Sequence, residues 1–344
     1  MKKSNWRIGI IVFSVLQITS CIPATQAPVP TPTNPPTATI ETLPTHSIDA
    51  QQYLADAIDV IQKNALNSKK VDWEKTRETA FNLEKDAKTP EDTYDTITYV
   101  LKQLGDHHSS IMTPEDANRL DNSTVENYLQ PKGKLIKDRI GYVAVFAFGA
   151  QSEAEMNKYA DEIQNIIIDL NQQSVCGWIV DLRANEGGNM YPMIAGLGAL
   201  IGEGTLGSFK DAAGKTVDWY YKDGQSGQGN EPIAAVSHPE FILEPEQTPV
   251  AVLIGPQTAS SGEATALSFR GRPNTRFFGQ PSSGLTTGND IFPLSDGAMI
   301  ILTVVTELDR TGQEYGGKIM PDVEASNPEA EATGWLFAQP ACQK

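Results

Sequence analysis

Residues 258–263 read Thr-Ala-Ser-Ser-Gly-Glu, and they decide how this chain should fold. They follow an apolar, strand-like run at 250–255 and precede a helix-forming run at 264–270. A serine at such a turn is exposed, and the first turn of the helix offers free N–H groups and the positive end of its dipole. An acyl-transfer nucleophile needs both features, although the same residues are also ordinary helix N-caps.

Strand-like and helix-like patterns alternate on both sides of this turn. Strand patterns lie at 140–146, 178–183, 276–279 and 298–306, and helix patterns lie at 153–170 and 193–200. The alternation predicts an α/β fold, with a mixed β-sheet core and flanking helices. Upstream, helical spacing and a helix start at residues 89–92 (Thr-Pro-Glu-Asp) predict a small N-terminal helical subdomain.

The first residues have the pattern of a bacterial export signal. Two lysines and an arginine accompany an apolar run at 8–16 that is too short to span a bilayer. Residues 18–21 read Ile-Thr-Ser-Cys and resemble a lipobox, whose cysteine is lipidated and becomes the mature N-terminus. We therefore expect a lipid on Cys21 and a chain held at the cell membrane, outside the cytoplasm. The alternative is a plain secretory signal with an incidental cysteine.

The domain layout follows from these patterns. Residues 23–44 are rich in Pro, Thr and Ala, a composition that cannot bury a core and favours extended conformations. We predict a signal peptide at 1–20, a lipidated cysteine and tether at 21–46, the helical subdomain at 47–138 and the α/β core at 139–344.

Composition excludes some classes of partner. The net charge is -16 and the pI is about 4.7, so no basic stripe exists to neutralise nucleic-acid phosphates. We find no set of Cys, His and carboxylate residues with the spacing of a metal site, and we predict no cofactor. Apart from Cys21, the cysteines are Cys176 and Cys342. In an exported protein they either form a disulfide or serve as buried apolar residues.

Four histidines are available to supply a base for Ser260. His46 lies in the tether, and His238 stands beside a proline in a loop. Residues 104–109 read Leu-Gly-Asp-His-His-Ser and form a tight loop after a helix. This loop is the natural source of the base, although a histidine pair after a helix more often caps it or decorates the surface.

A second loop also has catalytic character. Residues 181–188 read Asp-Leu-Arg-Ala-Asn-Glu-Gly-Gly and leave a buried strand pattern. Paired glycines let backbone N–H groups approach a ligand closely, and a simple strand-to-helix turn is the alternative. With residues 104–109, 258–263 and 316–322 (Gly-Gly-Lys-Ile-Met-Pro-Asp), the loop completes a series of four motifs. In this order the motifs resemble the tail-specific, or C-terminal-processing, serine protease superfamily, which includes the tricorn core. The resemblance covers residues 73–322.

The resemblance implies a ClpP/crotonase-like core and a set of site residues. The family's nucleophile lies three residues before the motif glutamate, which selects Ser260 over Ser261. The N–H of the next residue, Ser261, and a glycine N–H of the second loop, from Gly187 or Gly188, would form the oxyanion hole. The implied activity is that of a serine endopeptidase, which cuts polypeptides through an acyl-enzyme without a metal or cofactor.

The chain departs from the family pattern at the base. Many members pair the serine with a downstream lysine, but this chain has Leu285 there and no lysine between Ser260 and Lys318. A tricorn-like branch uses a histidine from the Asp-x-His-Ser loop instead, which implies that His108 is the base. Histidine can act near neutral pH without the burial that a lysine base requires.

A second departure concerns the acid that orients the base. The branch carries a glutamate just before the motif at 316–322, and the matching residue here is Tyr315. Glu314, one residue earlier, is therefore the expected third member. A one-residue slip would face it the wrong way in a strand but not in a loop. Asp106 is the reserve candidate.

Two other functions stay open. Many family members carry a PDZ domain before the core, and residues 110–138 are too few for one, so specificity should come from the core cleft and the helical subdomain. One alternative to the peptidase is a non-catalytic ligand- or peptide-binding lipoprotein on the same fold. A crotonase-like acyl-CoA enzyme is the other, and it fits poorly with export. The oligomeric state is not predicted.

Overall fold

The computed structural model describes residues 49–343 except 245–246. The expected signal peptide, Cys21 and the tether lie outside the described residues. The helices are α1 (Ala50–Asn64), α2 (Trp73–Leu83), α3 (Tyr94–Lys102), α4 (Pro114–Asp121), α5 (Glu153–Asn171), α6 (Met190–Ile201), α7 (Ser261–Leu267) and α8 (Pro328–Phe337). Within the described part, no helix has the length and apolar character needed to cross a membrane.

The strands form two sheets. They are β1 (Ser110–Met112), β2 (Lys132–Ile136), β3 (Ile140–Ala144), β4 (Gly177–Asp181), β5 (Gly204–Asp211), β6 (Thr216–Lys222), β7 (Gln225–Gln228), β8 (Glu231–Ala235), β9 (Val250–Ile254), β10 (Thr275–Gly279), β11 (Thr287–Pro293), β12 (Met299–Asp309) and β13 (Val323–Glu324). The order is β13-β10-β9-β4-β3-β2 in one sheet and β1-β12-β5-β6-β7-β8 in the other, where β11 also pairs with β12.

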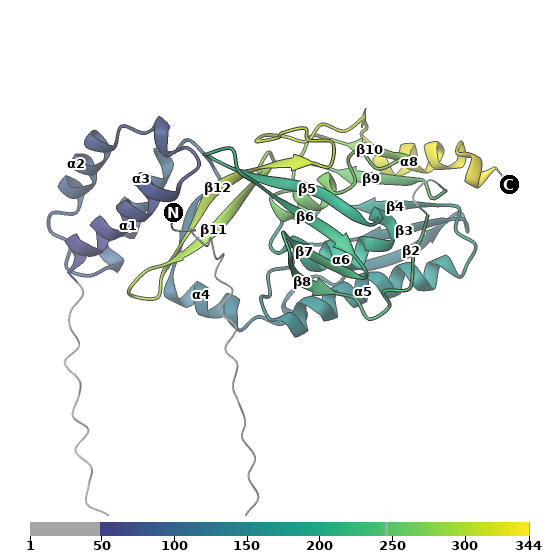
Figure 1. The fold of residues 1–344 in the computed structure, drawn as a ribbon, viewed down its shortest axis with the longest axis horizontal. Helices are drawn as coiled ribbons and strands as arrows, with labels where there is room; N and C mark the ends of the chain where they lie inside the picture. Colours follow the sequence, from purple (N-terminus) through teal and green to yellow (C-terminus); the bar gives the residue numbers. More distant parts are fainter. Residues whose placement is uncertain (1–48, 245–246, 344) are drawn as a thin grey trace, which may run out of the picture. The chain divides into compact units, whose positions relative to one another are not determined.

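The six-stranded sheet is parallel except for β2. Its central strands, β4 and β9, are buried along their whole length, as expected for parallel strands covered on both faces. Helices α5 and α6 pack against one face and α8 against the other (Figure 1). Helix α7 shares the apolar core of α5 and α6. Because β4 and β9 are parallel neighbours, the loops that follow them leave the sheet at the same edge.

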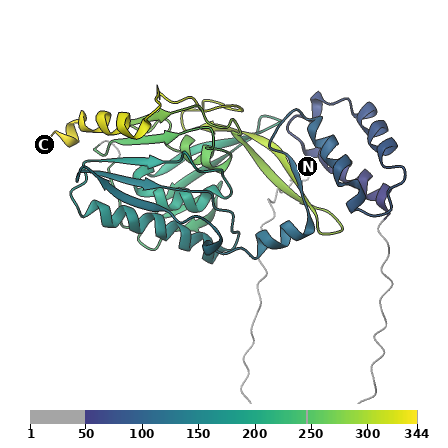
Figure 2. The same ribbon diagram turned by 180° about the vertical axis from the view of Figure 1, so that it is seen from behind.

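The seven-stranded sheet is antiparallel and is organised around β12. Helices α1 to α3 share a second apolar core with this strand (Figure 2), in which Tyr53, Leu54 and Ile97 pack with Ile300 and Leu302. The helical region is therefore anchored to the strand that also carries β11.

The sequence predicted a mixed α/β core with flanking helices and a helical N-terminal region, and the structure has this character. It differs in dividing the strands between two sheets. Strand β2 lies within the stretch assigned to the helical subdomain, and it pairs with β3. The pairing of the two cysteines, left open by the sequence, is settled by a disulfide between Cys176 and Cys342.

Candidate active site

Ser260 stands at the turn between β9 and α7. Its backbone has φ 52° and ψ -123°, a conformation that favours glycine and that costs a serine about 1–3 kcal/mol. The neighbouring loop holds the turn in place, because the Thr258 hydroxyl donates to the Leu182 carbonyl at 2.8 Å. The Ala259 N–H likewise donates to the Asn185 carbonyl at 3.0 Å. These bonds fix the serine relative to the loop at 182–188.

The buried side chain of Glu263 holds the same turn through hydrogen bonds. It is fully buried, and its carboxylate accepts the Ser260 N–H at 3.0 Å, which closes a capping box. It also accepts the Ser282 hydroxyl and the N–H groups of Gly284 and Leu285, at 2.9 and 2.7 Å. Burial raises its pKa, and these four hydrogen bonds act in the opposite direction. In the sequence analysis, the position of Glu263 only selected Ser260 over Ser261. The sequence did not predict its hydrogen bonds to the turn.

His108 reaches Ser260 from the loop between α3 and β1. Its Nε2 lies 2.8 Å from Ser260 Oγ. The loop is held by Asp106, whose carboxylate accepts the N–H groups of His108 at 3.1 Å and Ser109 at 2.8 Å. Burial lowers the pKa of the imidazole, and the charge of Asp106 partly offsets this effect. A half-buried neutral imidazole within hydrogen-bond reach of an alcohol can remove its proton.

Thr287, at the start of β11, occupies the place expected for an acid. Its Oγ1 lies 2.8 Å from His108 Nδ1. A threonine hydroxyl can accept the Nδ1–H bond, which leaves Nε2 free to accept from Ser260. The sequence did not predict a role for Thr287, because two adjacent threonines after a glycine-containing loop indicate no particular function.

The structure does not bring Glu314 to His108. The Glu314 carboxylate pairs with Lys210 and accepts the Thr306 hydroxyl at 3.0 Å. The hydrogen bond from Lys210 lowers its pKa. Tyr315, the position matched to the family glutamate, bonds Asp309 instead. The one-residue offset thus places the carboxylate on the exposed surface beside a lysine.

The N–H groups predicted to hold an oxyanion differ in their surroundings. The Gly187 N–H already donates to Asn185 Oδ1 at 3.0 Å and is buried. Gly188 is exposed as a residue, and neither its N–H nor the Ser261 N–H, at the first position of α7, has a hydrogen-bond acceptor among the described residues. The two loops are joined where the Ser261 hydroxyl donates to the Gly188 carbonyl at 2.7 Å. The Ser261 N–H directly follows Ser260 in the chain, and this bond brings the backbone of Gly188 beside Ser261.

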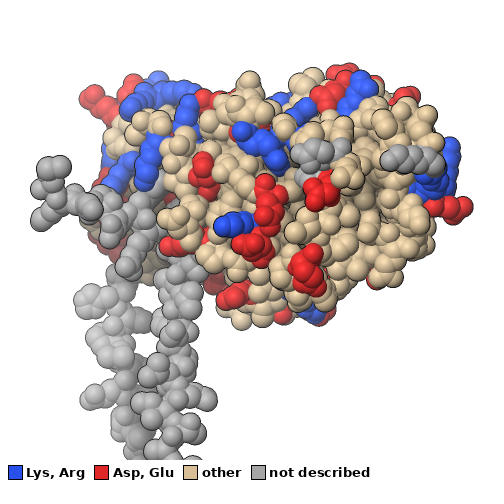
Figure 3. Space-filling model, turned by 45° about the vertical axis from the view of Figure 1, so that its right-hand side comes forward, with Lys and Arg blue, Asp and Glu red and all other residues tan. Residues whose placement is uncertain are grey.

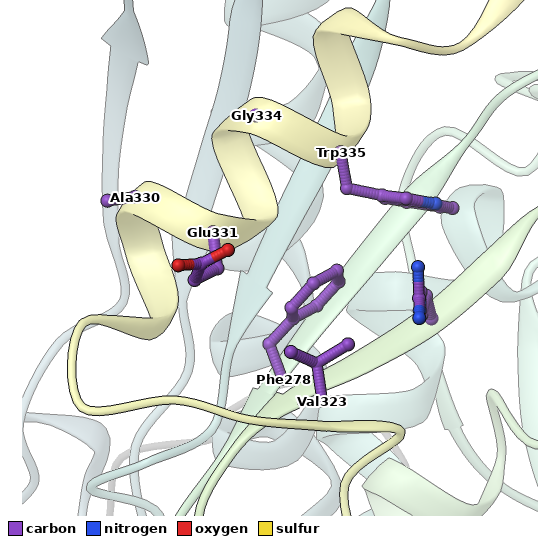
Figure 4. A pocket seen from close by; sticks show the side chains of 7 residues that line it. Phe278, Val323, Ala330, Glu331, Gly334 and Trp335 are labelled. Carbon is purple, nitrogen blue, oxygen red and sulfur yellow. The ribbon is translucent and has the colours of Figure 1, made fainter.

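One hollow of the described surface is lined by none of these site residues. It has a volume of about 500 Å³ and is formed where α8 crosses β10 and β13, with Phe278, Val323 and Trp335 among its walls (Figure 4). Residues 49–244 and 247–343 hold no group of three or more His, Cys, Asp or Glu that could bind a metal. On the face drawn in Figure 3, acidic and basic side chains are interspersed among broad uncharged areas.

Comparison with known proteins agrees with the geometry. Residues 139–325, more than half of the chain, match the model of peptidase family S41. The chain belongs to peptidase family S41. It is therefore a serine-type peptidase by family, and the resemblance inferred from the four motifs is confirmed.

Relatives of this S41 peptidase extend beyond the matched core. The nisin-resistance protein of Lactococcus lactis subsp. lactis is 29% identical over 290 residues, which cover 84% of this chain and 87% of that protein. A solved lipoprotein from Streptococcus agalactiae is 28% identical with a TM-score of 0.73, over 87% of this chain and 99% of that one. The photosystem II D1 C-terminal processing protease shares the fold, with 16% identity and a TM-score of 0.56, over 85% and 98% of the two chains.

Proposed function

We propose that the protein is an extracytoplasmic serine endopeptidase in which Ser260 is the nucleophile and His108 the general base. The observation that carries this proposal is the 2.8 Å contact between His108 Nε2 and Ser260 Oγ at a strained turn. The free N–H groups of Ser261 and Gly188 beside the turn support it further. Thr287, rather than Glu314, is proposed as the acceptor that orients the imidazole.

The proposed reaction follows from this geometry. His108 Nε2 takes the hydroxyl proton as Ser260 Oγ bonds to the carbonyl carbon of a peptide. The N–H groups of Ser261 and Gly188 stabilise the resulting oxyanion. The imidazolium then gives its proton to the leaving amine, and the C–N bond breaks to leave an acyl-enzyme. Water attacks the acyl group with His108 again acting as base, and Ser260 is regenerated. Thr287 accepts the Nδ1–H bond throughout.

We also propose that a lipid on Cys21 holds the enzyme at the membrane, with residues 21–46 as the tether. Cys21 lies outside the described residues. Support comes from the lipobox pattern, from the disulfide, which is typical of compartments outside the cytoplasm, and from the likeness to a streptococcal lipoprotein. We further propose that the core of this chain has a ClpP/crotonase-like fold.

The substrate class follows from the family and is a polypeptide. One relative is named for resistance to nisin, so nisin is a natural first peptide to test on this chain. An unfolded protein such as β-casein is the complementary probe, because it offers many peptide bonds without a stable fold.

The decisive experiment compares the wild type with Ser260→Ala. We expect the wild type to hydrolyse nisin or β-casein and to react with a fluorophosphonate probe. Mass spectrometry should place the label on Ser260 and not on Ser261. Ser260→Ala should lose both activities while its circular dichroism and unfolding midpoint show that the fold persists. Hydrolysis at the wild-type rate by Ser260→Ala would remove this mechanism. A wild type that takes no label at any pH would favour the non-catalytic binding protein.

A further inference from the structure

Strand β11 has one edge that no described strand covers. Residues 299–301 of β12 pair with β1 and also with β11, so these two strands lie on opposite edges of β12. Strand β5 pairs farther along β12, on the β1 side, and β11 pairs with β12 only. The outer edge of β11 is therefore unpaired within the described part of the chain.

The register determines which main-chain groups face this free edge. The Thr303 N–H donates to Ser109 Oγ at 3.0 Å, and the Thr303 carbonyl accepts the Leu66 N–H at 2.9 Å, so Thr303 points away from β11. Neighbouring residues in a strand point to opposite edges, and directly paired residues alternate between bonded and non-bonded pairs. Because Asn289 and Ile291 pair with residues 303 and 301, their N–H and C=O groups point outward.

The free edge begins at the catalytic base. Thr287, the first residue of β11, contacts His108 Nδ1. Two residues later, Asn289 Nδ2 donates to the His108 carbonyl at 3.1 Å, and its Oδ1 accepts the Thr303 hydroxyl at 2.9 Å. Side chains of β11 thus hold both the imidazole and the main chain of His108, so a chain lying along the edge has a fixed position relative to His108.

The edge lacks most of the features that protect exposed strands from pairing. Natural edges are commonly blocked by lysines, by prolines or by a covering helix. Here Ile291 is 49% exposed, the strand contains no lysine, and its one bulge lies at the end nearest Thr287, between residues 288 and 289. Proline occurs only at Pro293, which also faces outward because it pairs with residue 299. Between Thr287 and Pro293, two residues, Asn289 and Ile291, present free N–H groups at this edge.

We propose that the polypeptide substrate binds as an additional strand on the outer edge of β11, bonded to the main chain of Asn289 and Ile291. This inference rests on the proposed function and names the surface that presents the substrate to Ser260. Main-chain bonding selects extended, unfolded segments of any sequence, and exposed Ile291 adds a preference for an apolar side chain nearby. A folded protein, whose strands are already paired, would be a poor substrate.

The test removes one outward N–H. Ile291→Pro deletes the donor without breaking the ladder to β12, because the N–H of Ile291 does not face that strand. Ile291→Val is the matched variant, since it keeps the N–H and a branched apolar side chain. Both changes are placed in the Ser260→Ala protein, and binding of fluorescein-labelled β-casein is measured by anisotropy. We expect the Kd of the proline variant to be about 3- to 10-fold higher than that of the valine variant, the loss of one hydrogen bond.

Equal Kd values for the two variants would overturn the inference, as would the absence of β-casein binding by Ser260→Ala itself. Unfolding midpoints of the variants check that proline leaves the fold intact. Failure of the proposed function is recognised separately, because it appears as missing fluorophosphonate labelling of the protein with Ser260 present. The binding comparison does not depend on hydrolysis and still gives its answer in that case.

Discussion

A single histidine links the two halves of the candidate site. His108 comes from a loop 152 residues upstream of Ser260 and is half-buried between Ser260 and Thr287. Burial penalises the imidazolium and lowers the pKa below its usual 6.5, while the nearby charge of Asp106 raises it to a smaller extent. The unprotonated form, which a general base requires, is therefore favoured at neutral pH.

This shift fixes the sign of a pH dependence. The proposed base role requires neutral His108, so kcat/KM should be at its maximum above the lowered pKa and should fall as the pH drops through it. We expect the acid limb of kcat/KM to have its midpoint below pH 6.5. Asp106→Asn keeps Oδ1 as an N–H acceptor but removes the charge, so its limb should move to still lower pH. A midpoint above 6.5, or a shift upward in the variant, would contradict this account.

The hydroxyl of Thr287 should matter for turnover. Thr287→Val keeps the shape and removes the acceptor for Nδ1–H, so the imidazole loses its fixed tautomer and orientation. We expect kcat to fall roughly tenfold, the worth of one hydrogen bond. Thr287→Ser keeps the hydroxyl and should retain most of the rate. Steady-state kinetics on a peptide cut by the wild type measures both variants, and equal kcat for valine and wild type would show that Thr287 does not orient the base.

The sequence predicted some of these residues and not others. Ser260 and His108 could be predicted because each lies in a short motif, and the residues next to it in the sequence determine the turn. The choice between Gly187 and Gly188 could not, since it depends on where the Asn185 side chain points. Thr287 was missed for a similar reason, because its contact with His108 spans 179 residues and depends on how β11 is placed.

At the scale of elements, the hairpin of β11 and β12 connects the site to the helical region. Its tip is held by Asp296, which accepts the hydroxyls of Tyr53 at 2.8 Å and Tyr94. Its Oδ1 also accepts the Ala298 N–H at 3.0 Å and so shapes the turn. This one carboxylate fixes the far end of the strand whose near end contacts His108.

Removing that carboxylate should loosen the hairpin. Asp296→Ala leaves two tyrosine hydroxyls and one N–H without their acceptor. We therefore expect the free energy of unfolding to fall by about 2–3 kcal/mol. Urea unfolding followed by circular dichroism measures the change. Ser295→Ala is the matched control, since Ser295 is exposed and has no hydrogen-bond partner among the described residues. A loss no larger than that of the control would show that the tyrosines do not hold the tip.

Element prediction succeeded where periodicity was strong. Strands β4 and β9 are continuous apolar runs and helix α5 is a long amphipathic one, so their patterns were unambiguous. Strand β7 reads Gln-Ser-Gly-Gln, and β11 contains a glycine, a proline and three polar residues, so neither has a strand pattern of its own. Their strand character comes from neighbours that supply hydrogen bonds, which one-dimensional patterns do not contain.

For the whole molecule, the disulfide between Cys176 and Cys342 closes a loop with a sequence separation of 166 residues. It fastens the segment after α8 to the start of β4. Because so long a loop restricts the unfolded chain strongly, we expect the Cys176→Ala/Cys342→Ala variant to lose about 2–5 kcal/mol of unfolding free energy. Urea unfolding measures the difference.

The control for this prediction is reduction. A reductant should lower the unfolding midpoint of the wild type toward that of the double variant and leave the double variant unchanged. A wild type whose midpoint does not move after verified reduction would mean that the bond adds nothing to stability. The sequence allowed this pairing but could not require it, since two cysteines 166 positions apart meet only if the final segment returns to the central sheet.

The backbone at Ser260 has a consequence for how this lineage can evolve. A φ of 52° suits glycine, and the proposed role of Ser260 as nucleophile gives a reason for a hydroxyl there. In a descendant that no longer gains from cutting peptides, replacement by glycine would relieve the strain and delete the proposed nucleophile in one substitution. Selection for a sturdier protein would then keep the change. The identity of residue 260 in related chains should therefore indicate whether each of them still acts as a peptidase.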